Sequence, residues 1–212
     1  MMGWFDFARS PSGTSIETLR LPLFPLNTVL FPGSLLPLKI FEQRYLDMAA
    51  ASMKAQTPFG ICLIASGSEV GASAEPHPVG TLATIDQWEM EQLGILMIKV
   101  VGGRRFRIIN SQVGPGNLLE ATVELLAEGE PTPFPAERGR LLPLLRRIAS
   151  DLGSERLPEP HHYDDADWVG YRITEILPIQ NLAKQKLLEL EDPLARLEIL
   201  EKYLDQRKLL TP

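Results

Sequence analysis

Residues 21–41 read LPLFPLNTVLFPGSLLPLKIF, and this stretch decides the predicted fold. It holds two short apolar runs, at 21–26 and 35–41, and each run is interrupted by proline. Because proline cannot donate a hydrogen bond to a β-ladder, such runs are typical of edge strands or bulged strands. Pro32-Gly33 between them indicates a turn. The stretch therefore predicts a structure built from short strands.

The pattern of strands and turns continues to about residue 128. Apolar residues at helical spacing predict one inserted helix, roughly over 42–56. Gly102-Gly103 predicts a hairpin turn, because both glycines tolerate positive φ. Further strands are predicted over 59–65, 79–91, 93–101, 104–113 and 118–127, with a surface loop over 66–78. Many short strands with a single helix predict a small barrel or sandwich rather than a parallel α/β sheet.

The composition changes at residues 128–135, which are rich in proline, and the apolar spacing beyond them is helical. In the last predicted helix, Asp192 is the N-cap and Pro193 the first helical residue. Its apolar stripe consists of Leu194, Leu197, Leu200 and Leu204. The fold class is α+β. The predicted organisation is a flexible tail over 1–18, a β-barrel subdomain over 19–128, a linker over 129–135 and a helical subdomain over 136–212.

Composition and charge narrow the classes of function. The net charge of −6 repels phosphate backbones, so nucleic acid is a disfavoured partner. No apolar run approaches the ~20 residues of a membrane span, and the first residues do not form a signal peptide, so we expect a cytoplasmic protein without a membrane partner. Cys62 is the single cysteine, which excludes an internal disulfide and a Cys-based zinc cluster. A buried structural thiol is favoured over a nucleophile there.

The tail holds three aromatic residues, Trp4, Phe5 and Phe7. A disordered leader is the favoured interpretation of this segment. The alternative is a short motif that docks on a partner or on a neighbouring copy of the chain.

Motifs that bind nucleotides or activate a serine are absent from the sequence: there is no Gly-x4-Gly-Lys-Ser/Thr, no Gly-x-Gly-x-x-Gly and no Gly-x-Ser-x-Gly. Potential metal ligands are densest at 161–167, which reads HHYDDAD. A solvated loop with acidic residues at a helix start is favoured over a metal site, because adjacent side chains rarely point at one ion. We therefore assign no catalytic residue, no cofactor and no metal ligand.

Two further groups of residues each allow two interpretations. Arg104, Arg105 and Arg107, with Lys99 nearby, form either a solvated face paired with carboxylates such as Glu89 or Glu91, or a patch that binds anions or RNA. Phe24, Phe31, Phe41 and Tyr45 either pack in the core, which is favoured, or line a ligand groove. The binding surface stays unknown at this level.

Several blocks of the sequence resemble a known family. The segment 21–33 followed by 36–45 resembles the opening of the N-terminal substrate-recognition domain of Lon proteases. Blocks at 59–63, 79–83, 103–108, 175–178, 184–188 and 192–197 are similar to its later parts, in the same order. The resemblance covers about residues 19–208, nearly the whole chain.

The resemblance implies a pseudo-barrel related to the PUA fold, followed by a helical bundle. It also implies a non-catalytic module that captures unfolded or tagged polypeptide segments, with an adaptor for a separate protease as one form of this function. Lon would continue into an ATPase and a Ser-Lys protease beyond Pro212, so no proteolysis is expected, and no active-site or binding residue is carried over. The alternatives are an RNA-binding PUA-like module and a small-molecule enzyme of unknown reaction.

Overall fold

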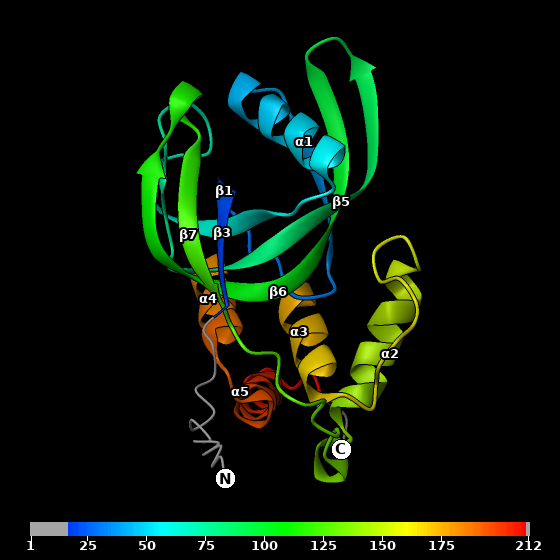
Figure 1. Cartoon of the computed structure of the whole chain (residues 1–212). Helices are drawn as coiled ribbons and strands as arrows, with labels where there is room; N and C mark the ends of the chain where they lie inside the picture. Colours follow the sequence, from blue (N-terminus) through cyan, green and yellow to red (C-terminus); the bar gives the residue numbers. More distant parts are fainter. Residues whose placement is uncertain (1–16, 211–212) are drawn as a thin grey trace, which may run out of the picture.

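The computed structural model describes residues 17–210, so Trp4 and the other tail aromatics lie outside the described residues. A seven-stranded sheet curls into a pseudo-barrel with one helix against it, and four helices follow (Figure 1). The strands are β1 (Thr18–Leu26), β2 (Leu35–Ile40), β3 (Phe59–Ser66), β4 (Glu75–Pro76), β5 (Val79–Gln92), β6 (Ile95–Val113) and β7 (Leu119–Leu125). The helices are α1 (Gln43–Ala55), α2 (Leu141–Leu152), α3 (Ala166–Ile176), α4 (Asn181–Glu189) and α5 (Pro193–Gln206). The α+β prediction is confirmed.

The barrel closes through β1, which has a different partner along each half of its length. The strand order is β1-β7-β6-β5-β3-β4, and β1 also pairs with β3 in parallel. Residues 18–23 pair with β7, whereas residues 23–26 pair with β3. Pro22 and Pro25 each lie where only one neighbour is paired. Each proline therefore has an unpaired side, which is what the prediction of an edge or bulged strand required, although β1 as a whole has a neighbouring strand on both sides.

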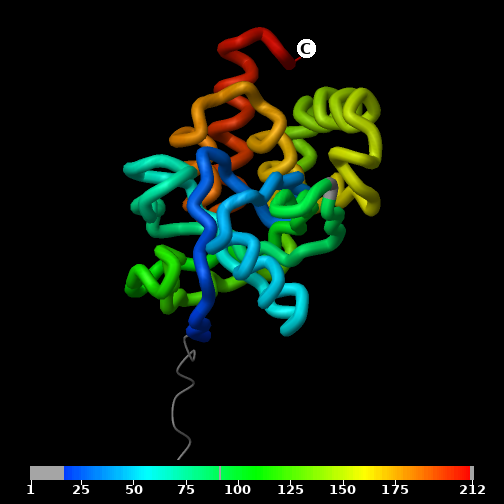
Figure 2. The backbone as a smooth tube through the Cα atoms, turned by 90° about the horizontal axis from the view of Figure 1, so that it is seen from above, coloured from blue at the N-terminus to red at the C-terminus, as the bar shows by residue number. Residues whose placement is uncertain are grey.

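Part of the sheet extends beyond the barrel as a wing, which we define as β2, residues 84–92 of β5 and residues 95–101 of β6. In the wing, β6 lies between β2 and β5. The core-facing residues of β6 are Leu96, Ile98 and Val100, and they pack in one buried cluster with Tyr45, Met48 and Ala49 of α1. The β5–β6 hairpin of the wing projects past α1 at the top of the molecule (Figure 1), and Figure 2 looks down on this end.

The prediction of a hairpin turn at Gly102-Gly103 was wrong. Both glycines lie inside β6, which runs without a break from Ile95 to Val113, and the turn between β5 and β6 falls at Leu93-Gly94. Gly94 has a φ of +84°. A Cβ on Gly102 would lie 2.1 Å from the carbonyl oxygen of Phe31. The backbone of Phe31 passes so close to Gly102 that only glycine fits there. Because a tight turn also favours glycine, the sequence alone does not distinguish the two causes.

The helical half has its own core, formed by α2, α3 and α5. Asp192 caps α5, since its carboxylate accepts a hydrogen bond from the Leu194 amide at 2.8 Å, and Pro193 is the first residue of the helix. Leu197, Leu200 and Leu204 are buried as predicted. Leu194 is 41% exposed, so the predicted stripe was wrong at its first member. This leucine lies in the first turn of α5, at the end of the bundle.

The two halves meet through side chains of α3 and α4. The Arg172 guanidinium of α3 is 1% exposed and donates to the Pro32 carbonyl at 2.6 Å and to Ser34 Oγ at 2.8 Å. Burial lowers the pKa of Arg172, whereas the Glu175 carboxylate at 3.1 Å raises it. A separate apolar cluster spans the junction and consists of Val29, Phe31, Leu63, Val79, Leu126, Tyr171 and Leu188.

Candidate functional site

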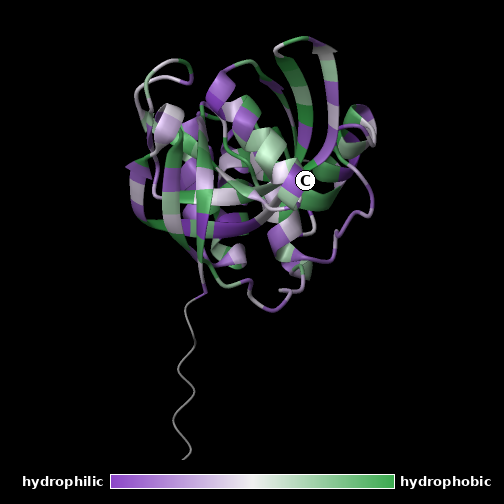
Figure 3. Cartoon of the chain, turned by 45° about the horizontal axis from the view of Figure 1, so that its top comes forward, coloured by the Kyte–Doolittle hydropathy of each residue, from purple (hydrophilic) through white to green (hydrophobic). Residues whose placement is uncertain are grey.

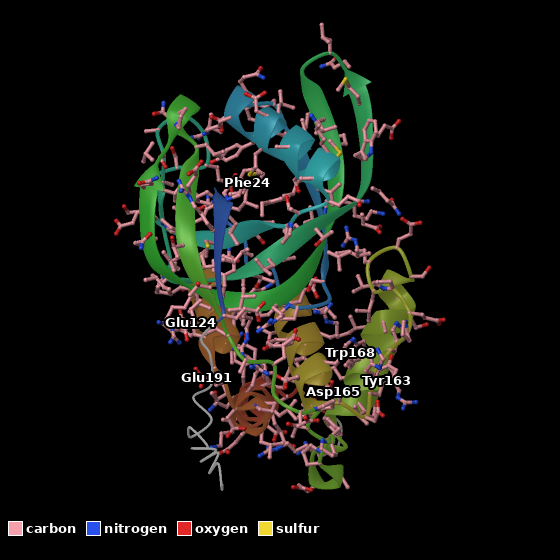
Figure 4. The ribbon with its side chains drawn as sticks, in the orientation of Figure 1. Phe24, Glu124, Tyr163, Asp165, Trp168 and Glu191 are labelled. Carbon is pink, nitrogen blue, oxygen red and sulfur yellow. The ribbon has the colours of Figure 1, made fainter. Side chains whose placement is uncertain are left out.

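The side chains at 161–167 form an aromatic cluster and a helix cap. His161 bonds through Nε2 to the Leu157 carbonyl at 3.1 Å, and its Nδ1 lies 3.2 Å from the Tyr163 hydroxyl. Tyr163 and Trp168 lie edge to face with ring centroids 5.2 Å apart (Figure 4). Asp165 accepts from the Asp167 amide and thereby caps α3. Within residues 17–210, no group of three or more His, Cys, Asp or Glu side chains is placed to hold a metal ion.

The three arginines at 104–107 divide between two places: Arg104 pairs with a carboxylate before β1, whereas Arg105 and Arg107 both reach the end of α4 and the residues just after it. Arg104 pairs with Glu17 at 2.7 Å, and Arg107 lies 3.7 Å from Glu191. Arg105 donates to the carbonyls of Leu188 and Leu190 at the end of α4. A cation there complements the negative end of the helix dipole. The observed carboxylate partners are therefore Glu17 and Glu191 rather than the predicted Glu89, and Arg105 joins the two halves; the side chain of Glu91, the other predicted partner, lies outside the described part of the structure.

Cys62 is 1% exposed in the barrel wall, and burial strongly raises the pKa of its thiol. A thiol that stays protonated is a poor nucleophile.

The predicted aromatic stripe separates into three environments. Phe24 stacks on Tyr45 with ring centroids 4.0 Å apart, under α1. Phe31 is buried in the junction between the halves. Phe41 follows β2 and is 54% exposed. The favoured prediction of core packing is confirmed for Phe31, Phe24 and Tyr45, although the last two also line a groove. It was wrong for Phe41, which lines the same groove from an exposed position.

This groove, the β2 groove, lies between β2, the end of β1 and the loop at 69–70. Its volume is about 290 Å³. Its lining residues are mainly apolar: Phe24, Leu26, Thr28, Leu36, Pro37, Leu38, Lys39, Ile40, Phe41, Glu42, Tyr45, Glu69 and Val70. Glu42 also accepts a hydrogen bond from the Gly71 amide, which holds the loop against the start of α1. The walls are thus a strand on one side and a loop on the other.

The wing carries an exposed apolar surface, the hairpin patch, which we define as Trp88, Met90 and Leu93. Trp88 is 60% exposed, Met90 55% and Leu93 98%. Trp88 is opposite Ile98 and Met90 is opposite Leu96 in the ladder, so both side chains lie on the face that α1 covers elsewhere. Figure 3 shows hydrophobic bands along this projecting hairpin. Helix α1 therefore covers only part of the apolar face of the wing, and the rest of this face, near the tip of the hairpin, is exposed to solvent.

Sequence reasoning missed the hairpin patch. Strand periodicity alone does not show where a face stops being covered by another element, and Trp88 and Met90 have the alternation of a half-buried strand. Leu93 was the residue from which the sequence could have indicated this exposed surface. It stands beside Gly94 at the turn, where glycine, asparagine or another polar residue is the rule. A leucine at the tip of a hairpin has no core to pack against.

A larger hollow, of about 560 Å³, separates β2 from the helical half. It is lined by Leu35, Pro37, Lys99, Leu152, Glu155, Arg156, Leu157, Glu175 and Ile176. Charged groups of both signs stand among its apolar residues. Lys99, which we expected to lie near the arginines at 104–107, lines this hollow instead.

The described residues form a closed pseudo-barrel with an attached helical half and an uncovered apolar hairpin. The family model of the substrate-binding domain of the ATP-dependent protease La (LON) matches residues 20–206, and the chain belongs to this family. The predicted resemblance is confirmed.

Solved structures agree with this assignment. The Lon N-terminal domain protein from Xanthomonas campestris is 32% identical with a TM-score of 0.73, over 87% of this chain and 98% of that one. The N-terminal domain of a Mycobacterium avium complex Lon protease shares the fold at 21% identity, with a TM-score of 0.63 over 88% of this chain and 98% of that one.

Full-length relatives are much longer than this chain. The Lon protease of Cytophaga hutchinsonii is 26% identical over 199 residues, which are 88% of this chain and 24% of the relative. Lon protease 1 of Bdellovibrio bacteriovorus is 31% identical over 137 residues, which are 62% of this chain and 17% of the relative. The chain thus spans about a quarter or less of these curated relatives. In the described part of the chain, every helix is too short or too polar to span a bilayer.

Proposed function

We propose that this chain captures apolar segments of unfolded or tagged polypeptides, and that the hairpin patch is the anchor. The observation that supports this proposal most directly is the exposure of Trp88, Met90 and Leu93 on a projecting hairpin. Large aromatic side chains and methionine are enriched in protein interfaces, and methionine adapts to partners of varied shape. Membership of a substrate-binding family supports a polypeptide as the ligand.

The proposal also holds that the chain acts by binding rather than by catalysis. The family model that matches residues 20–206 describes a substrate-binding domain, and the match includes neither an ATPase nor a protease region. The buried Cys62 and the capped, solvated 161–167 segment supply no activated nucleophile in the part of the chain that the structure describes. In this account, the chain holds a segment and presents it to a separate protease.

A binding titration tests the proposal. The probe is reduced, carboxymethylated α-lactalbumin, which stays unfolded, and native α-lactalbumin is the folded comparison. We expect the wild-type chain to bind the unfolded probe and to ignore the folded one. The double variant Trp88→Ala/Leu93→Ser should weaken binding at least about tenfold, because each side chain contributes roughly 1.5–3 kcal/mol when it is buried against a partner.

The matched control is Ile199→Ser on α5. Ile199 is 48% exposed, so it is comparable in exposure with Met90 but lies on the helical half. Its replacement should leave the affinity unchanged. A hairpin double variant that binds the unfolded probe within about twofold of wild type would show that the anchor is elsewhere.

A further inference from the structure

One edge of the wing has no partner strand. Within residues 17–210, β2 pairs with β6 alone, so its other edge is unpaired. The same edge borders the β2 groove, to which seven consecutive residues, 36–42, contribute. An unpaired strand edge is a row of backbone donors and acceptors that another extended chain can bind.

The ladder identifies which backbone groups point outward. The Gly102 amide donates to the Ser34 carbonyl at 2.9 Å, and the register then runs from Leu35 opposite Val101 to Ile40 opposite Leu96. In an antiparallel pair, alternate residues exchange both hydrogen bonds with the partner. Bonded pairs therefore recur every second residue from Ser34. The backbone groups of Leu35, Pro37 and Lys39 face the open edge.

Pro37 is compatible with this assignment, and it reduces the number of backbone donors on the open edge. At its position the missing N–H would point away from β6, so the proline costs the ladder no hydrogen bond. The open edge then offers two donors, the amides of Leu35 and Lys39, and three acceptor carbonyls. Proline and lysine on an edge strand also discourage pairing between copies of the same protein. The edge is suited to reversible pairing rather than to permanent assembly.

The groove beside this edge suits side chains rather than a whole small molecule. Its volume of about 290 Å³ falls just below the ~300–1,000 Å³ of typical small-molecule pockets. Leu36 and Leu38 of β2 are only partly buried, and they face the stacked rings of Phe24 and Tyr45 across one apolar cluster. A strand added to β2 places every second side chain against this apolar floor.

The other open edge of the wing is less suited to pairing. Residues 84–92 of β5 also lack a second partner among the described strands, but their register with β6 shifts between Ile85 and Gln87 and again between Met90 and Gln92. Such bulges twist an edge and interrupt its regular spacing. The pairing of β2 with β6 contains no shift.

We propose that β2 binds an extended apolar polypeptide segment by strand addition, with its backbone on the open edge and alternate side chains in the β2 groove. This inference rests on the proposed function and gives its mode of recognition. Backbone pairing tolerates many sequences, as capture of unfolded chains requires. The hairpin patch lies on the opposite edge of the same wing, about 10 Å away at two strand spacings, so one polypeptide reaches both.

The test uses three variants of the full chain and the same unfolded probe, carboxymethylated α-lactalbumin. Lys39→Pro removes an outward donor without removing a bond to β6, whereas Lys39→Ala removes the lysine side chain beyond Cβ and keeps the amide donor. Pro37→Val restores the missing donor. One hydrogen bond changes affinity about two- to tenfold, so we expect Lys39→Pro to bind that much more weakly and Pro37→Val that much more tightly. The loss for Lys39→Pro is measured against Lys39→Ala, because both variants lack the lysine side chain and only the proline lacks the amide donor.

Amide exchange measured by NMR separates strand addition from a change in folding. With wild-type protein and bound probe, the Leu35 and Lys39 amides should become protected. Binding that leaves both amides unprotected, with Lys39→Pro equal to Lys39→Ala, overturns strand addition and leaves the proposed function intact. A probe that does not bind wild-type protein at all overturns both proposals. Dimerisation of Pro37→Val in sedimentation without probe, together with unchanged probe affinity, would assign the edge to a second copy.

Discussion

Gly102 and Gly103 are neighbours in β6 with very different surroundings. A Cβ on Gly102 would meet the Phe31 carbonyl oxygen at 2.1 Å, whereas a Cβ on Gly103 would meet the Leu82 Cβ at 3.5 Å, which is an ordinary contact. Because the obstacle at Gly102 is backbone, rotation of a side chain does not relieve it. Gly102→Ala should therefore lower the free energy of unfolding by at least about 2 kcal/mol.

The measurement is denaturant unfolding of both alanine variants. Gly103→Ala should stay within about 1 kcal/mol of wild type, because it adds one methyl group in open contact. Equal stability of the two variants would contradict the close approach of Phe31 to β6.

Single residues also show which structural features could be predicted from the sequence and which could not. The cap at Asp192 was predictable because its hydrogen bond is local, two residues along the chain. The role of Gly102 was not, because it depends on Phe31, 71 positions earlier. The exposure of Trp88 and Met90 depends on how far α1 covers the wing, which is also a tertiary fact.

At the scale of the element, α5 presents a buried and an exposed apolar residue two positions apart. Leu197 is 0% exposed in the helical core, and Ile199 is 48% exposed. Leu197→Asp loses apolar burial and places a carboxylate among leucines, so it should destabilise the protein by more than about 4 kcal/mol. Ile199→Asp introduces the same group into solvent and should cost about 1 kcal/mol or less.

Thermal unfolding of the two variants checks this helix orientation. A Leu197→Asp protein that melts within a degree or two of wild type would mean that the buried stripe of α5 is no core. Helical spacing predicted the stripe correctly at Leu197, Leu200 and Leu204. It was wrong at Leu194, which is 41% exposed in the first turn of the helix.

At the scale of the whole molecule, the two halves share buried polar contacts and one apolar cluster. Arg172 and Arg105 each cross the junction to backbone carbonyls, and Gln185 of α4 donates to the Val79 carbonyl at 3.0 Å. Unfolding of either half would break these hydrogen bonds and expose the apolar cluster of the junction to water, which is costly. We therefore propose that the predicted subdomains unfold together, although a proline-rich segment separates them in sequence.

Calorimetry tests this coupling. We expect a single transition with equal calorimetric and van't Hoff enthalpies, and Arg172→Ala should lower its midpoint without dividing it. Two separated transitions in the wild-type protein would show that the halves are independent units.

The central claim is that unfolded polypeptides contact the tip of the wing. Site-specific photo-crosslinking tests it most directly, with p-benzoylphenylalanine in place of Leu93, which is 98% exposed, or in place of Ile199 on the far helix as the control. Both positions are accessible, so both variants should fold as the wild type does. Illumination with carboxymethylated α-lactalbumin should crosslink the probe at position 93 and not at position 199, and native α-lactalbumin should crosslink at neither. Equal crosslinking from both positions, or none from position 93 while the probe is bound, would contradict the claim.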